Sequence, residues 1–233
     1  MNALQAERHR LYDAPEGLVR ALVLELARPA DWDLLSPLWR GVQTDLALPA
    51  PAIAVSGVDG YQLWFSLAEP VAVVEAAAFL DALRRHYLGG VSPGRIRTIP
   101  SLAGTPHSPQ PESLPQIPEE QPGTSRWSAY VASDLAPIFA EEPWLFQEPS
   151  PDAQASVLNR LSSIKPAAFQ AALALLRPAA PSGRPAPVSA GTAPPQEPRS
   201  FLLAVMNDPA TDLQWRIEAA KALLPYFERP AGA

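Results

Sequence analysis

Short apolar stretches in the first hundred residues predict a small set of strands. Ala21–Leu26 is a short apolar run of the kind that forms a buried strand. Ala52–Ser56 predicts a second strand, and Arg95–Ile99 predicts a further one near the end of this segment. Tyr61–Leu67 alternates between apolar and more polar positions, which puts Gln62 on the face opposite the apolar one.

Two helices are predicted between these strands. The first follows Asp31 or Asp33, either of which can cap it, and stops before Pro49. The second opens at Pro70, which suits a first helical turn, and ends at Gly89-Gly90. Their inward positions are Leu35, Leu38, Trp39, Val42 and Leu46, then Val71, Val74, Ala78, Phe79, Ala82, Leu83 and Tyr87. Because two short strands flank the Gly57–Gly60 turn like a hairpin, we expect residues 1–99 to form an α+β domain. A small mixed sheet with packed helices is the expected form of this domain.

The remaining apolar periodicity predicts helices. Residues 126–177 are predicted to be a helical segment, with helices opening at Ser150-Pro151 and at Pro166. Residues 200–229 are predicted to form a helical hairpin whose turn is Asn207-Asp208-Pro209. Such a two-helix unit is too small to fold alone, so it needs a partner.

Proline separates these segments. The chain has 29 Pro in 233 residues, well above the usual share of about 5%. Seven prolines fall within residues 100–122 and seven more within 178–198, and neither stretch has helical or strand periodicity. We therefore predict Pro-rich disordered linkers over 100–125 and 178–199.

Composition excludes several classes of protein. The chain has no Cys, which excludes a disulfide scaffold, an iron–sulfur site, a thiolate zinc site and a cysteine nucleophile. Its apolar runs are far shorter than the ~18 residues of a membrane span, and Met1–Arg10 is polar and of mixed charge, unlike a secretory signal. A cytoplasmic protein with no membrane partner is therefore expected. The net charge of −6 argues against broad nonspecific nucleic-acid binding but leaves room for a local basic groove.

The stretch from Ser56 to Phe65 carries the clearest chemical hint. A Ser-Gly turn before a strand can expose backbone N–H groups, and Gly57 and Gly60 allow a phosphate to approach closely. Gln62, on the face opposite the apolar one, could then meet a ligand. The alternative is an ordinary hairpin turn that needs glycines for positive φ, with Gln62 and Trp64 on a solvated face.

This stretch resembles the second motif of archaeo-eukaryotic primase-polymerases, in which Ser-Gly-x-x-Gly-x-His precedes an apolar strand. Ser56, Gly57 and Gly60 match in register, and Gln62 stands where the family has its nucleotide-binding histidine. The order of elements over residues 18–101 also agrees, and Ile96–Pro100 is similar to the family's later Arg-containing stretch. The resemblance implies nucleotide or phosphate binding by Ser56, Gly57, Gly60, Gln62 and Arg97.

The departures from the family pattern fall at the metal ligands. In the family the first strand ends in Asp-x-Asp, which holds the divalent cations, whereas this chain reads Glu25-Leu26-Ala27. Glu25 is the one candidate catalytic carboxylate, since Ala27 cannot bind a cation, and two-metal chemistry needs several carboxylates. We therefore expect a degenerate domain with no catalytic residue and no cofactor. Mg²⁺ or Mn²⁺ would be needed only if a nucleotidyltransferase activity is retained.

Other candidate residues have structural alternatives. His9, His86 and His107 are too scattered to predict a shared metal site. Trp32, Trp39 and Trp64 could stack on bases, although packing is the commoner role of Trp. The one basic cluster could contact phosphates or form a solvated helix end beside Asp81; it comprises Arg84, Arg85, Arg95 and Arg97.

The C-terminal hairpin is similar to one found near the ends of phage small terminase-like proteins. This resemblance implies a prophage or other mobile-element origin, with replication or packaging proteins of that element as partners. Together the two resemblances lead us to expect a DNA-binding protein of replication with single-stranded DNA or nucleotide as ligand. The alternative from another class is an interaction scaffold that recruits partners through its helices.

Overall fold

The computed structural model describes residues 2–101 and 113–177, together with short helical stretches at 202–203, 206–207, 216–218 and 220–223. The chain divides into two units, Met1–Pro178 and Ala179–Ala233. The predicted linker residues 102–112 and 178–199 lie outside the described residues, as does most of the predicted hairpin over 200–229. No helix among the described residues combines the length and the apolar character that crossing a membrane requires.

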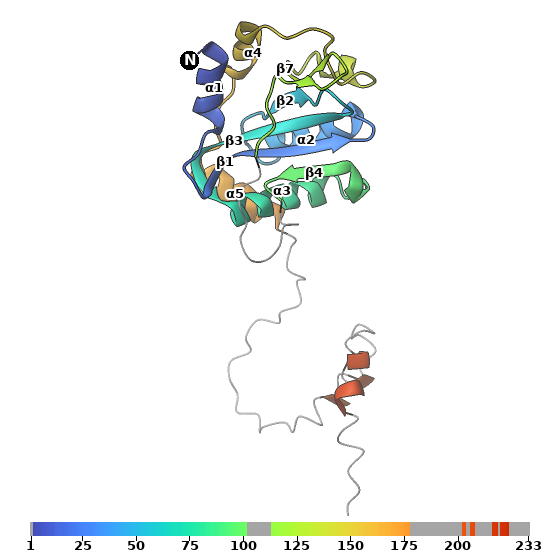
Figure 1. Cartoon of the computed structure of the whole chain (residues 1–233). Coiled ribbons are helices and arrows are strands. Elements are labelled where there is room, and N and C mark those ends of the chain that lie inside the picture. Colours follow the sequence, from blue (N-terminus) through green and yellow to red (C-terminus); the bar gives the residue numbers. More distant parts are fainter. Residues whose placement is uncertain are drawn as a thin grey trace, which may run out of the picture. The chain divides into compact units, whose positions relative to one another are not determined.

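An antiparallel sheet is the centre of the first unit (Figure 1). Within the described residues its strand order is β4-β1-β3-β2-β7, and the strands are β1 (Leu18–Ala27), β2 (Ala52–Val55), β3 (Gly60–Ala72), β4 (Ile96–Ile99) and β7 (Ala129–Val131). Two further short strands, β5 (Glu120–Gln121) and β6 (Arg126–Trp127), pair with each other. Every neighbouring pair in the large sheet is antiparallel, whereas we had expected a mixed sheet.

Helices cover both faces of this sheet, which confirms the predicted α+β class (Figure 1). The α-helices are α1 (Ala3–Tyr12), α2 (Trp32–Thr44), α3 (Val73–Tyr87), α4 (Pro151–Leu158) and α5 (Pro166–Leu176). Two 3-10 helices are also present, η1 (Pro93–Arg95) and η2 (Ala136–Phe139). Asp31 caps α2 as the sequence predicts, because its carboxylate accepts a hydrogen bond from the Leu34 N–H at 3.0 Å.

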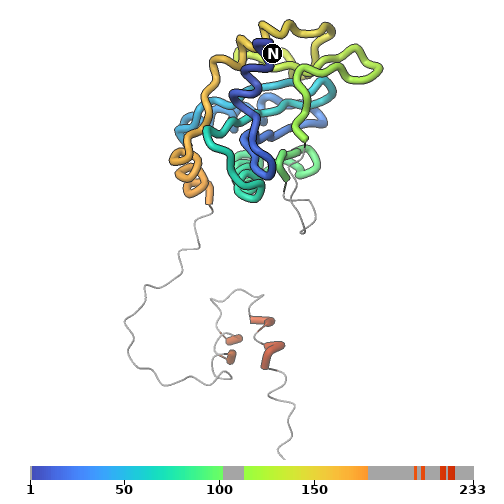
Figure 2. The backbone as a smooth tube through the Cα atoms, turned by 60° about the vertical axis from the view of Figure 1, so that its left-hand side comes forward, coloured from blue at the N-terminus to red at the C-terminus, as the bar shows by residue number. Residues whose placement is uncertain are grey.

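The face covered by α2, α3 and α5, here called face A, holds the larger core. Alternate residues of β1 and β3, such as Leu24 and Leu63, pack here against the apolar stripes of the helices. Phe79 of α3 meets Phe169 of α5 with ring centroids 5.0 Å apart, and the two helices lie side by side (Figure 2).

The opposite face, here called face B, carries α1 and α4. Its core is smaller and more aromatic, because Tyr12, Trp64 and Tyr130 meet there with centroid distances between 5.2 and 6.4 Å. Ile117, within the predicted linker 100–125, is buried in this core. The stretch around Ile117 therefore packs against the sheet, which differs from the predicted linker.

The first unit also differs from the prediction at two places near its helices. Strand β3 continues through Pro70 to Ala72, because Val71 and Ala72 pair with the start of β1, so α3 begins at Val73. The sequence pattern did not predict α1, although Asn2 and Gln5 form a capping box there.

The predicted helical segment over 126–177 instead begins with strands β6 and β7. Strand β7 pairs with β2 and forms one edge of the sheet. Gln154 of α4 occupies the outer side of this edge, since its amide accepts from the Tyr130 N–H at 2.7 Å and donates to the Tyr130 carbonyl at 3.0 Å. The chain after β7 thus folds back as part of the first unit.

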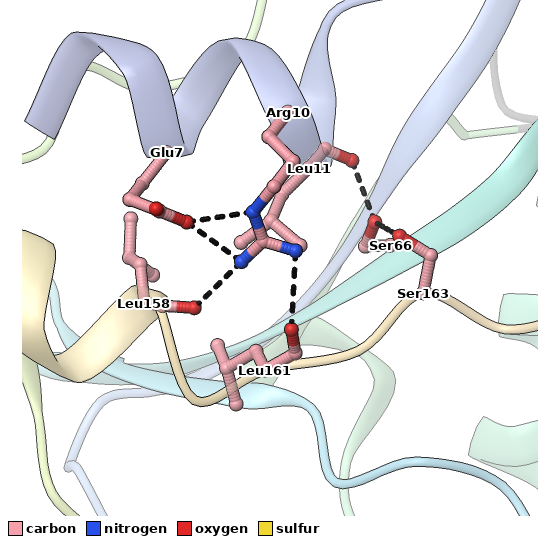
Figure 3. A network of polar contacts seen from close by, with 7 residues as sticks. All are labelled: Glu7, Arg10, Leu11, Ser66, Leu158, Leu161 and Ser163. Atoms are coloured by element: carbon pink, nitrogen blue, oxygen red, sulfur yellow. Dashed lines mark hydrogen bonds and ion pairs between the residues drawn. The ribbon is translucent and has the colours of Figure 1, made fainter.

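A polar network joins α1 to the chain around the end of α4 (Figure 3). The Arg10 guanidinium donates to the carbonyls of Leu158, at 3.1 Å, and Leu161, at 3.2 Å, and is held by Glu7. Leu158 ends α4, so a cation meets carbonyls at a helix C-terminus, where positive charge is favourable. Beside it, Ser66 of β3 donates to the Leu11 carbonyl at 2.6 Å.

Replacing Arg10 tests this network. Arg10→Met keeps the aliphatic stem but removes the guanidinium's hydrogen bonds to both carbonyls, of which Leu158 keeps the Leu161 N–H as a donor. Hydrogen bonds from a charged group contribute most when they are fully buried, and exposure to solvent weakens them. Because this side chain is 43% exposed, we expect the free energy of unfolding to fall by only about 1 kcal/mol. Urea denaturation measures the loss. Arg85→Met, which removes an exposed ion pair within α3, is the control, and an equal loss in both variants contradicts a stabilising role for the network.

Candidate functional site

Three strands place polar side chains next to one another on face B. In the strand register, Arg97 of β4 lies opposite Glu25 of β1, and Glu25 lies opposite Gln62 of β3. Because residues directly opposite in a sheet point to the same face, the three side chains form one row. The row continues to Ala54 of β2 and Tyr130 of β7, so its polar part is at the β4 side of the sheet.

Gln62 is a buried member of this row. It is 5% exposed, and its Oε1 accepts a hydrogen bond from the Trp64 indole N–H at 2.9 Å. The Gln62 side chain also favours the ionised form of Glu25 and so lowers the pKa of this carboxyl, since an amide N–H can donate to a carboxylate. Gln62 therefore lies between Trp64 and Glu25 on face B.

Glu25 has the perturbed carboxyl of the site. Burial raises its pKa above the usual range, and Asp59 raises it further. The hydrogen bond from Gln62 and the charges of Arg97 and Arg28 act in the opposite direction but do not cancel the effect of burial. The row thus combines a half-buried acid with cations on its outer side.

The bend at 56–60 lies directly beside this row. The Ser56 hydroxyl accepts hydrogen bonds from the N–H groups of Val58, Asp59 and Gly60, at 3.2, 3.1 and 2.9 Å. The Gly57 N–H donates to the Pro143 carbonyl at 3.0 Å, and the Ser56 N–H to the Gly60 carbonyl at 2.9 Å. Every backbone N–H of the bend therefore has a partner within the chain.

Both glycines of the motif occupy positions where a side chain does not fit. Gly57 has φ of 81°, and a Cβ there would lie 2.9 Å from the Ser128 nitrogen. A Cβ on Gly60 would lie 2.9 Å from the Ala27 Cβ and 3.1 Å from Oε1 of Glu25. The glycine at 60 thus leaves room for the Glu25 carboxyl, which links the motif to the acid in space.

The basic residues of the predicted cluster separate in the structure. Arg84 and Arg85 both pair with Asp81 on α3, a helix of face A. Arg95 donates to the carbonyls of Ala27, at 3.2 Å, and Pro29, at 2.8 Å, and so fixes the end of β1. Arg97 of β4 is exposed, and its place opposite Glu25 puts it on face B.

The tryptophans considered as stacking surfaces are packing residues. Trp64 is 1% exposed and Trp32 is 9% exposed, and both lie within aromatic clusters. The Trp39 indole donates to the Pro51 carbonyl at 3.1 Å. Trp32 and Trp64 therefore offer no open ring face to a base, whereas Trp39 is half-buried and lines a cavity at the edge of the sheet.

The residues present do not fit the two-metal centre that the resemblance implies. Among the residues that the structure describes, no three His, Asp or Glu side chains lie close enough to hold a metal ion. Ala27 is at the end of β1, beside the bend, where it contributes no oxygen. Glu25 itself is engaged by Gln62.

Arg28 and Asp59 are two members of the site that sequence reasoning did not single out. Their charges act on Glu25, and the Arg28 N–H donates to the Asp59 carbonyl at 3.2 Å. Their positions in the sequence could have identified them, because Arg28 directly follows the first strand and Asp59 lies within the glycine-bounded bend.

No family model matches this chain, and no curated protein matches it. The resemblance to primase-polymerases therefore depends on the motif residues alone.

The raised pKa of Glu25 predicts how the stability of the fold depends on pH. Because burial raises the pKa of Glu25, the folded chain binds its proton more tightly than the unfolded chain does. This contribution to stability is complete below the ordinary pKa of 4.5 and is lost as pH rises through the raised value. Glu25→Gln removes the titration. The free energy of unfolding of the variant, relative to wild type, should therefore increase between about pH 4 and about pH 7.

Urea denaturation at several pH values measures this difference. Glu16→Gln, which neutralises an exposed carboxyl, controls for the change in net charge. A relative stability of Glu25→Gln that is constant with pH, or that decreases as pH rises, contradicts the raised pKa.

Proposed function

We propose that the first unit is a degenerate primase-polymerase-like domain that binds single-stranded DNA or nucleotide without catalysing nucleotidyl transfer. The observation that supports this most directly is the row of Arg97, Glu25 and Gln62, on neighbouring strands beside the glycine bend. Motif residues far apart in the sequence meet there, as the resemblance requires. If the short motifs matched only by chance, their residues would not need to be neighbours in the folded chain.

Side chains provide the phosphate contacts in this proposal. The N–H groups of the bend are engaged by Ser56 and Pro143. A phosphate is therefore met by the exposed guanidinium groups of Arg97 and of Arg28, the latter of which also donates to the Gly94 carbonyl. Ser56, Gly57 and Gly60 shape the bend, and Gln62 orients Glu25, whose carboxyl can accept a hydrogen bond from a base or sugar.

The non-catalytic part of the proposal follows from the donor set. Phosphoryl transfer by two metal ions needs several carboxylates around the cations. Glu25 has Gln62, Arg97 and one further acid, Asp59, near it, and no group of three possible ligands among the described residues can hold a metal ion. Binding of nucleic acid by cationic side chains needs no such centre. In this proposal the protein is cytoplasmic and works in replication or handling of the DNA of a phage or other mobile element. Its partners are replication or packaging proteins of that element.

Binding of the full chain to fluorescent oligo(dT) of about 20 nucleotides tests the proposal. Anisotropy should report binding that weakens as salt rises. Arg97→Ala should weaken binding and reduce the slope of log K against log salt by about one, because one phosphate contact is lost. The control is Arg85→Ala, which removes an exposed arginine from a helix of face A and should leave the affinity unchanged.

Two results would contradict this function. One is the absence of salt-dependent binding both to oligo(dT) and to nucleoside triphosphate, the latter monitored as thermal stabilisation. The other is an equal effect of Arg97→Ala and Arg85→Ala. The first result favours the scaffold, in which the α+β unit only supports the helical segments.

A further inference from the structure

Strand β1 has a strand partner along only part of one of its two sides. On one side β3 pairs with it over Leu18–Ala27, whereas on the other side β4 pairs only with Val23–Leu26. Among the described residues, no strand lies beside Val19–Leu22 on the β4 side. This stretch is called here the open edge. Pro100, which directly follows β4, lacks the backbone N–H that continued pairing would need.

A groove of about 380 Å³ runs along the open edge. Its lining includes both Val19 and Ala21, although Val19 packs in the core of face A and Ala21 packs in the core of face B. The register shift between these two residues accounts for the change of face. Because the groove reaches residues of both faces, it lies at the edge of the strand. Since β3 occupies the other edge, the groove is on the side of β4, where Ile99 also lines it.

Two neighbouring segments border this groove. Residues 12–17, which connect α1 to β1, line it together with Ile99, Pro100 and Leu114. The open edge therefore lies within a groove rather than on an outer surface. A single extended segment fits between such borders, whereas a second folded chain would bring its own helices against them.

The backbone of the groove selects the conformation of its occupant. An unpaired strand edge presents N–H and C=O groups that pair with another extended chain. Leu18, which is 39% exposed, and the half-buried Leu114 add apolar contacts for alternate side chains of that chain. The occupant that fits is therefore a short strand with apolar residues at every second position.

The charges of the groove add one preference. Three charged residues line it, namely Asp13, Glu16 and Arg20. The Arg20 guanidinium donates to the Leu67 carbonyl at 2.7 Å, and Asp13 pairs with His9. The exposed Glu16 is the remaining charge, and it favours a Lys or Arg on the incoming strand.

We propose that the open edge binds an extended segment of a partner protein, which adds to the sheet as a strand beside β1. Main-chain hydrogen bonds to Val19–Leu22 provide the affinity, and apolar side chains next to Leu18 and Leu114 with a cation near Glu16 provide the specificity. The proposal does not depend on DNA binding, because the open edge belongs to the first half of β1 and Glu25 to the second half.

A synthetic peptide probes the open edge in the full chain. The probe has about seven residues in which Val and Lys alternate, long enough to pair with the whole edge at about 3.4 Å per residue. Two matched peptides carry N-methyl groups, one on the Val amides and the other on the Lys amides. Successive N–H groups of a strand point to opposite sides, so only one of these sets faces β1. In fluorescence anisotropy the two methylated peptides should differ in affinity at least about tenfold, since two or more hydrogen bonds are lost in one of them.

Hydrogen exchange and two sets of variants locate the binding. Amide exchange within Val19–Leu22 should slow when the unmethylated peptide binds. Leu18→Ser with Leu114→Ser should weaken this peptide at least about tenfold, and Glu16→Lys should weaken it as well. The matched controls are Val74→Ser with Leu175→Ser, on α3 and α5, and Glu69→Lys, which reverses another exposed acid. The controls should keep wild-type affinity, and circular dichroism confirms that all variants fold.

Three outcomes overturn the proposal. One is the absence of binding by the unmethylated peptide, and the second is equal affinity of the two methylated peptides, which indicates attraction to net charge alone. The third is a dimer of the wild-type chain that Leu18→Ser with Leu114→Ser converts to a monomer, since the open edge would then bind a second copy. Oligo(dT) binding should be unchanged in this double variant, which separates the proposal from the proposed function.

Discussion

The pairing of β1 with β3 is the constraint on which the rest of this structure depends. These two long strands are central in the sheet, and their register sets Gly60 opposite Ala27 and Gln62 opposite Glu25. A slip of one residue would move every side chain to the other face. It would place the Glu25 carboxyl among the leucines that pack under α2 and α3. The buried apolar side chains on both faces therefore fix the position of the polar row, although the row itself contributes little apolar burial.

The local elements could be predicted from the sequence because their signals are local. The apolar run of β1, the alternation in β3 and the Asp31 cap of α2 each depend on neighbouring residues, and each was predicted. Strand β7, through which the chain rejoins the sheet beside β2, could not be predicted from neighbouring residues. Its three residues pair with β2 more than 70 positions earlier, and the decisive contact, Gln154 on Tyr130, depends on tertiary packing. Ile117 was likewise hidden in a proline-rich stretch.

The candidate site was predictable in part. The motif identified Gln62 and the bend, and the resemblance identified Glu25 and Arg97, but only the register shows that they are neighbours. The structure also changes the role of the bend. Its N–H groups are held by Ser56 and Pro143, and Gln62 is held between Trp64 and Glu25. Under the proposed function, the cationic side chains beside this row contact nucleic acid.

Metal-dependent primer synthesis by the purified chain tests most directly whether this arrangement has lost its catalytic chemistry. The assay supplies template, nucleoside triphosphates and either Mg²⁺ or Mn²⁺. Because Asp59 is the only acid whose charge is seen to act on Glu25, and no group of three acids or histidines among the described residues can hold a metal ion, we expect no synthesis above background with either metal. Robust synthesis that Glu25→Ala abolishes would contradict this account.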